Sequence, residues 1–97
     1  MRDDLCRAIA ERRLVMFAYG GQVRVVEPHL LGRTTAEHDA LSAWMRPGWS
    51  RTDPDGAWRM FRLDGIAELQ LLPETFDVPR PDFNRDDPHF VEAYCRL

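Results

Sequence analysis

Three arginines, Arg24, Arg59 and Arg62, lie among apolar residues that favour β-strands. A guanidinium group presents a planar fork of donors that matches a phosphate and can also stack on a base, so these arginines are candidates for binding an anion. A set of internal ion pairs is an equally good interpretation, because the carboxylates of Glu27 and Asp64 are close in sequence. Strict strand alternation places Arg59 and Arg62 on opposite faces of a sheet unless a bulge intervenes.

Aromatic and imidazole side chains add further candidates for a binding site. Tyr19, Trp44 and Trp58 could stack on a base, although burial in a small core or at an interface is the commoner fate of such residues. His29 follows the bend expected at Pro28 and could contact an anion or sense pH, with a partly exposed structural histidine as the alternative. The candidate ligand-binding residues are therefore Tyr19, Arg24, His29, Arg59 and Arg62.

Motifs that carry enzymatic chemistry are missing from the sequence. Ser42 and Ser50 lack the Gly-x-Ser-x-Gly elbow, and there is neither a phosphate-binding glycine loop nor a His-Glu-x-x-His motif. The spacing of Asp53 and Asp55 is similar to the start of a calcium loop, but its glycine is misplaced, so we interpret it as a turn. We therefore expect no catalysis, no metal and no cofactor.

Length and composition are those of one ordinary globular domain. The chain has 97 residues, of which 44% are hydrophobic and 30% charged, and its net charge of −3 argues against coating of duplex nucleic acid. No apolar run approaches the roughly 20 residues of a membrane span, and Asp3 and Asp4 stand where a signal peptide would be basic. We therefore expect a cytoplasmic protein in which Cys6 and Cys95 are reduced, partly buried thiols.

The periodicity of the apolar residues predicts one helix followed by five short strands. Asp3 and Asp4 would cap the helix. Strands are expected at residues 15–19, 22–26, 40–45, 58–63 and 66–72, and the second would continue extended through residues 29–32. Gly20-Gly21 would form the tight turn of a hairpin, because glycine tolerates positive φ. Strands so closely spaced predict a small, strongly bent sheet or barrel.

The C-terminal part of the chain has a different character. After Pro73, prolines and polar residues predict an extended segment with poor helix and strand propensity. Asp87-Pro88 then predicts a capped helix start, with Phe90, Tyr94 and Leu97 along one side of a short terminal helix. This apolar stripe could pack on a neighbouring subunit instead of on the chain's own core.

The order and spacing of several short motifs resemble the WYL domain, a bacterial regulatory module. The matching residues are Ala8-Ile9, Phe17-x-Tyr19, Arg24-x-Val26-Glu27-Pro28, Leu30, Leu41, Arg59-x-Phe61-Arg62-Leu63-Asp64, Ile66, Phe76 and Pro79. Residues 1–84 would then form the WYL-like domain, and residues 85–97 a helical tail. The resemblance implies a mainly β fold with flanking helices: an N-terminal helix, a five-stranded bent barrel of the Sm-like or SH3 type, an extended tail and a short C-terminal helix.

In WYL domains, aromatic and arginine side chains of these segments are thought to bind a nucleotide or a single-stranded nucleic acid that controls an attached helix-turn-helix domain. The resemblance implies this role for Tyr19, Arg24, Arg59 and Arg62. Two positions depart from the family pattern. Asp39-Ala40-Leu41 stands where the family has Trp-Tyr-Leu, and Gly65 stands where an Asp-Arg-Ile motif has its arginine.

Two functions from different classes are compatible with the sequence. The first is a non-catalytic domain that senses a nucleotide or a short single-stranded nucleic acid and acts, away from any membrane, through a separate partner in transcriptional or defence regulation. The second is a protein interaction or oligomerisation module, for example a homodimer, that has lost its nucleotide ligand. The two departures from the family pattern favour the second function.

Overall fold

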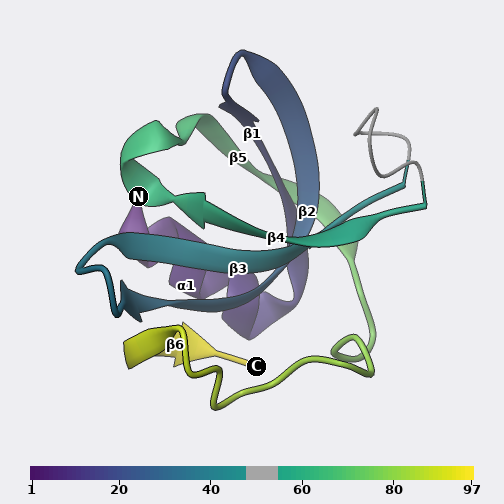
Figure 1. Ribbon diagram of the computed structural model, residues 1–97. Coiled ribbons are helices and arrows are strands. Elements are labelled where there is room, and N and C mark those ends of the chain that lie inside the picture. The colour runs from purple at the N-terminus through teal and green to yellow at the C-terminus, as the bar shows by residue number, and fades with distance from the viewer. Residues whose placement is uncertain (48–54) are drawn as a thin grey trace.

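A computed structural model describes residues 1–47 and 55–97, and its architecture is mainly β (Figure 1). Its elements are α1 (Arg2–Glu11), β1 (Arg13–Tyr19), β2 (Gln22–Thr34), β3 (Asp39–Met45), β4 (Ala57–Arg62), the short 3-10 helix η1 (Leu63–Gly65), β5 (Ala67–Thr75) and β6 (Phe90–Arg96). The helix and the five predicted strands are therefore confirmed. Of the turn predicted at residues 53–56, Asp53 and Pro54 lie outside the described residues, as does Ser50.

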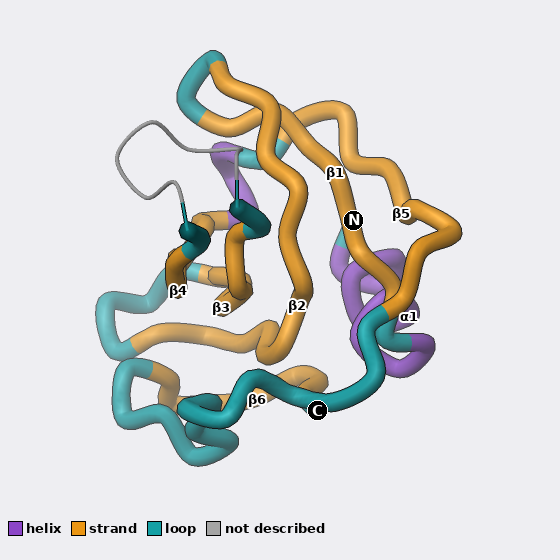
Figure 2. The backbone as a smooth tube through the Cα atoms, turned by 90° about the vertical axis from the view of Figure 1, so that its right-hand side faces the viewer, coloured by secondary structure: helices purple, strands orange, loops and turns teal. Residues whose placement is uncertain are grey.

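The strands form one antiparallel sheet organised around the long strand β2. The strand order is β4-β3-β2-β1-β5, and β6 pairs separately with β2. The first part of β2 pairs with β1, with Arg24 opposite Phe17, and its last part pairs with β6. The irregularity predicted at Pro28 is a register shift in the pairing of β2 with β3. Strand β2 pairs with β1, β3 and β6 along its length, and the sheet bends along this strand (Figure 2).

The predicted barrel is an open sheet rather than a closed one. Within the described part of the chain, β4 pairs only with β3, β5 only with β1 and β6 only with β2, so these three strands have unpaired edges. The sheet nevertheless curls around its inner face, which packs against α1 (Figures 1 and 2). Both turn glycines of the β1–β2 hairpin have positive φ, 59° for Gly20 and 76° for Gly21, as the sequence predicts.

The C-terminal helix predicted from the apolar stripe is wrong, because residues 90–96 form β6. The segment from Phe90 to Arg96 pairs with the free edge of β2, and this long-range pairing outweighs the local helical pattern. Tyr94 and Leu97 pack against the main core of their own chain. Tyr94 and Leu97 of the stripe thus pack within their own chain rather than on a neighbouring subunit.

The hydrophobic core lies mainly between α1 and the inner face of the sheet. The helix contributes Leu5, Ala8 and Ile9, all at most 2% exposed. Asp3 and Asp4 do not cap it, because the N-cap residue is Met1. They lie in the first turn instead, where carboxylates interact favourably with the helix dipole. A smaller cluster on the outer face is formed by Leu14, Val25 and Phe76.

The two cysteines are joined, which corrects the expectation of reduced thiols. Cys6 of α1 and Cys95 of β6 form a disulfide with a Cα–Cα distance of 5.6 Å and a sequence separation of 89 residues. They meet because β6 adds to the sheet beside α1, a contact that the sequence-based helix prediction could not provide. In the described residues, no helix has the length and apolar character needed to cross a membrane.

Candidate ligand-binding site

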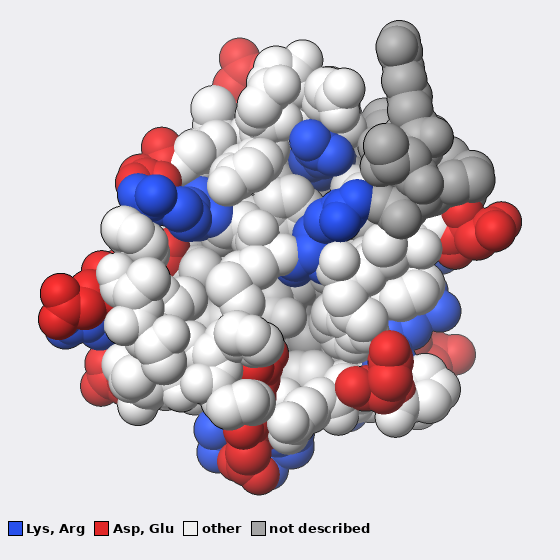
Figure 3. Space-filling model, in the orientation of Figure 1, with Lys and Arg blue, Asp and Glu red and all other residues white. Residues whose placement is uncertain are grey.

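Tyr19, Arg24 and Arg59 lie on the same face of the sheet. In an antiparallel pair, directly opposed residues project to the same side, so Arg24 shares a face with the buried Phe17. Arg59 precedes the buried Phe61 by two residues and therefore projects to that same inner face. The strands thus place three of the five candidate residues on one face of the sheet. Basic side chains gather where β2 and β4 cross, near the centre of the face in Figure 3.

The guanidinium group of Arg24 is half-buried and poorly satisfied. Its Nη1 lies 3.7 Å from Met45 Sδ, its Nη2 donates to the backbone oxygen of Tyr19 at 3.4 Å, and its buried Nε has no hydrogen-bond partner. Both contacts are long for hydrogen bonds. Among residues 1–47 and 55–97, no carboxylate lies within ion-pair distance of Arg24. A bound anion would stabilise such a partly buried cation by accepting charge-assisted hydrogen bonds from it.

Tyr19 is held in position beside Arg24. Its ring packs edge-on against Phe61, with centroids 5.1 Å apart, and against Phe17 at 6.5 Å. Its hydroxyl accepts a hydrogen bond from the backbone N–H of Arg62 at 3.2 Å. The ring is partly exposed, so an ordered aromatic edge remains available next to the guanidinium group.

Arg62 and Arg59 differ in their surroundings, as strand alternation predicts. Arg62 Nη2 forms an ion pair with Asp64 Oδ2 at 2.6 Å, and the two side chains are 49% and 68% exposed. The ion-pair interpretation therefore holds for Arg62, although such an exposed pair contributes little stability. Arg59 is exposed and also interacts within the chain. Arg62 contributes to the candidate site through its backbone N–H, which donates to the Tyr19 hydroxyl.

His29 is fully buried, and it has a structural role. Its Nε2 accepts a hydrogen bond from the Arg80 backbone N–H at 3.1 Å, so the ring proton lies on Nδ1, which donates to the Glu27 backbone oxygen at 2.8 Å. Burial lowers the pKa of His29 below its usual value, against smaller opposing effects from Glu27. Both ring nitrogens are thus occupied inside the protein, and His29 does not join the Tyr19 and Arg24 group.

A buried ion-pair network explains why Arg24 lacks a carboxylate. Glu27, only 3% exposed, receives two hydrogen bonds from Arg80, at 2.7 Å and 3.1 Å, and its Oε2 lies 3.3 Å from Arg46 Nε. The Arg80 guanidinium also lies 4.7 Å above the ring of Trp44. Because Glu27 is three residues from Arg24 along a strand, it projects to the other face. Arg80 is not among the residues predicted from the sequence, where its place between two prolines is its only signal.

Trp44 and Trp58 also lie on the outer face, away from Tyr19. They oppose each other across β3 and β4, with ring centroids 5.9 Å apart. The indole Nε1–H of Trp58 donates to Asp82 at 2.8 Å. These tryptophans hold the tail segment against the sheet, through the contacts of Trp58 with Asp82 and Phe83 and of Trp44 with Arg80.

Comparison with known proteins gives one informative likeness. No family model matches the chain, and no curated protein matches it. Among solved structures, the fold is similar to that of proteasome accessory factor B/C (PafBC) of Arthrobacter aurescens, with a TM-score of 0.68 and 28% sequence identity. PafBC is a WYL-domain-containing regulator. The likeness suggests a WYL-related fold. It covers 87% of this chain but only 13% of PafBC, so it concerns one portion of a much longer protein.

Proposed function

We propose that this chain is a non-catalytic regulatory domain that senses a nucleotide or a short single-stranded nucleic acid. The observation that supports the proposal most directly is the half-buried guanidinium group of Arg24, with a buried Nε that lacks a partner. Phosphate is a suitable ligand for such a group because it accepts charge-assisted hydrogen bonds from a planar fork of donors.

The residues near Arg24 could bind the remaining parts of a nucleotide. Arg59, on the same face, would contact a second phosphate oxygen or the next phosphate of a strand. The partly exposed ring of Tyr19 would lie against the base, because aromatic rings bind unstacked bases with little sequence preference. A single strand suits this site better than a duplex, since the net charge of the chain is −3.

The output of the domain would pass through a separate partner protein in transcriptional or defence regulation. The likeness to the regulator PafBC is consistent with a regulatory role and with the absence of catalysis. The match covers 13% of PafBC, so the likeness does not extend to the rest of that regulator. Ligand binding would act by shifting the population of conformers that the partner recognises.

A cytoplasmic location fits such a regulator, and it is open to direct measurement. The Cys6–Cys95 disulfide argues in the other direction, because disulfides are rare in reducing compartments. The oligomeric state is likewise a prediction. Light scattering would decide whether the chain forms the homodimer considered above.

The proposal is tested by fluorescence anisotropy with a labelled hexathymidylate at low salt, with unlabelled mononucleotides as competitors. Wild-type protein should bind, and affinity should fall with increasing salt. The double variant Arg24→Ala, Arg59→Ala should bind at least about tenfold more weakly, since each charge-assisted contact contributes about 1.5–3 kcal/mol. Arg33→Ala is the matched control, because Arg33 is exposed and paired with Glu37 at 3.4 Å. No wild-type binding, or equal affinity in the double variant, would refute the proposal.

A further inference from the structure

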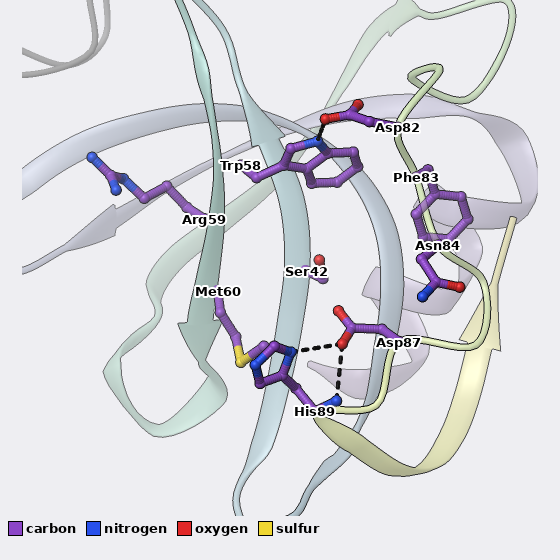
Figure 4. Close-up of a pocket in the computed structure, with 9 residues that line it drawn as sticks. All are labelled: Ser42, Trp58, Arg59, Met60, Asp82, Phe83, Asn84, Asp87 and His89. Carbon is purple, nitrogen blue, oxygen red and sulfur yellow. Dashed lines mark hydrogen bonds and ion pairs between the residues drawn. The ribbon is translucent and has the colours of Figure 1, made fainter.

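A pocket that differs in its chemistry from the Tyr19 and Arg24 site lies on the outer face of the sheet (Figure 4). It has a volume of about 270 Å³ and lies between β4 and the tail segment that crosses it. The residues that matter for its chemistry are Trp58, Met60, Asp82, Phe83, Asp87 and His89. Figure 4 shows Trp58 and Phe83 on one side of the hollow, and Met60, Asp87 and His89 on the other.

The walls of the pocket are aromatic and apolar. The rings of Trp58 and Phe83 are nearly parallel, with an interplanar angle of 24° and a centroid separation of 6.0 Å. Met60 projects from β4 and is 43% exposed, which is high for a large apolar side chain. Such surfaces attract the methylene stem of a long side chain, and an indole face attracts a cation.

The pocket holds two carboxylates, neither of which is paired with an arginine of the described residues, although Asp87 would form an ion pair with a protonated His89. Asp82 Oδ2 accepts the indole N–H of Trp58, and Asp87 Oδ1 accepts both the backbone N–H and the ring Nδ1 of His89, at 2.9 Å and 2.7 Å. In the described ranges, no arginine lies within ion-pair distance of either carboxylate. Arg59 borders the pocket, but its side chain is directed away from it (Figure 4).

The position of the pocket favours a peptide over a small molecule. Strand β4 pairs only with β3 within the described residues, so its other edge can accept an added strand. An extended peptide on that edge presents alternate side chains to the outer face, where Trp58 and Met60 border the pocket. A long basic side chain would then place its stem on Met60 and its charge near Asp82 and Asp87.

We propose that this pocket receives an arginine side chain from an extended segment of a partner protein. The guanidinium group would stack against Trp58 and donate hydrogen bonds to the carboxylates of Asp82 and Asp87. Arginine suits the pocket better than lysine, because a planar guanidinium group can stack on an aromatic ring and bind a carboxylate at the same time. The site is on the opposite face from Tyr19 and Arg24, so it does not depend on the nucleotide proposal.

The test is an NMR titration of the Trp58 indole N–H, assigned by its loss in Trp58→Phe. The probe is the blocked tripeptide Val-Arg-Val, and the control is the same peptide with citrulline, which keeps the shape of arginine but is neutral. Wild-type protein should give a saturable shift with the arginine peptide and at least about fivefold weaker binding with the citrulline peptide. Equal binding of the two peptides, or no shift with either, would overturn the proposal.

Two matched variants separate a specific pocket from general attraction. Asp82→Asn, Asp87→Asn keeps hydrogen-bond acceptors for Trp58 and His89 but removes both charges, and should weaken arginine binding by about fivefold or more. Asp77→Asn, Asp86→Asn removes the same charge from exposed positions outside the pocket and should have no effect. An equal loss in both variants would contradict the proposal, as would spermidine shifting the Trp58 signal at lower concentration than the arginine peptide.

Discussion

The ring of Tyr19 occupies the space that a side chain at Gly65 would need. A Cβ atom on Gly65 would lie 2.7 Å from Tyr19 Cε1 and 3.3 Å from Cδ1 and Cζ. The ring cannot move away freely, because its hydroxyl accepts the backbone N–H of Arg62. Gly65, which departs from the WYL pattern, therefore leaves room for the Tyr19 ring at the candidate ligand-binding site.

This relationship predicts that Gly65→Ala destabilises the protein through Tyr19. Overpacking of this kind costs about 1–3 kcal/mol in the free energy of unfolding, measured by urea denaturation. In a Tyr19→Ala background the same substitution should cost less than about 0.5 kcal/mol, since the ring that it meets is gone. Equal costs in the two backgrounds would show that Gly65 is required for another reason.

Local patterns predicted the elements well where the apolar period was clear. The alternation of Leu41, Ala43 and Met45 places all three on the buried face of β3, with zero exposure. The β1–β2 hairpin followed from two adjacent glycines. Information of this kind is local, because it depends on residues that are neighbours in the sequence.

Interactions between distant segments could not be predicted in the same way. The carboxylate of Asp39, where the family has tryptophan, accepts a hydrogen bond from the Tyr94 hydroxyl at 2.6 Å. This pairing depends on β6 lying beside β2, and so does the disulfide. For the candidate site, the sequence predicts Tyr19, Arg24 and His29 together, whereas the structure places Tyr19 and Arg24 close together and buries His29 elsewhere. A bend at Pro28 is predicted from the sequence, but the position of Arg80 against His29 and Glu27 is not, because these residues are more than 50 positions apart.

The buried carboxylate of Glu27 should contribute more to stability than any exposed pair. Glu27→Gln removes the charge that holds Arg80 and Arg46, and we expect a loss of about 2 kcal/mol in the free energy of unfolding. The expected loss is moderate because both arginines remain about one-third exposed. As a control, Glu37→Gln breaks only the exposed pair with Arg33 and should change stability by less than about 0.5 kcal/mol. Similar losses in the two variants would contradict the assignment of Glu27.

The Cys6–Cys95 disulfide should stabilise the fold strongly because it closes a long loop. The disulfide links residues 89 positions apart and so reduces the entropy of the unfolded chain. Disulfides typically contribute about 2–4 kcal/mol to the free energy of unfolding. Cys6→Ser, Cys95→Ser should therefore unfold at lower urea concentration than oxidised wild type, and dithiothreitol should lower the wild-type midpoint without affecting the variant. Free thiols in freshly purified, non-reduced protein would contradict the linkage.

His29 should make the protein less stable as the pH falls. Because burial lowers its pKa in the folded state, the unfolded chain binds a proton first, with a pKa of about 6.5. The stability that the neutral ring provides is complete above that value and is lost as the pH falls from about 6.5 towards the folded-state pKa. NMR of the folded protein should show His29 titrating at lower pH than in urea. A higher folded-state pKa would contradict the neutral, doubly bonded ring.

The most direct test of the proposed function observes Arg24 itself. In 15N-labelled protein at low salt, titration with hexathymidylate should shift the Arg24 Nε–H resonance saturably, because a phosphate bound at the exposed part of the guanidinium group changes the surroundings of Nε. The Tyr19 ring protons should shift at the same oligonucleotide concentrations, whereas the Nε–H of exposed Arg33 should stay unchanged. An unchanged Arg24 signal at saturating oligonucleotide, or an equal shift at Arg33, would contradict the account.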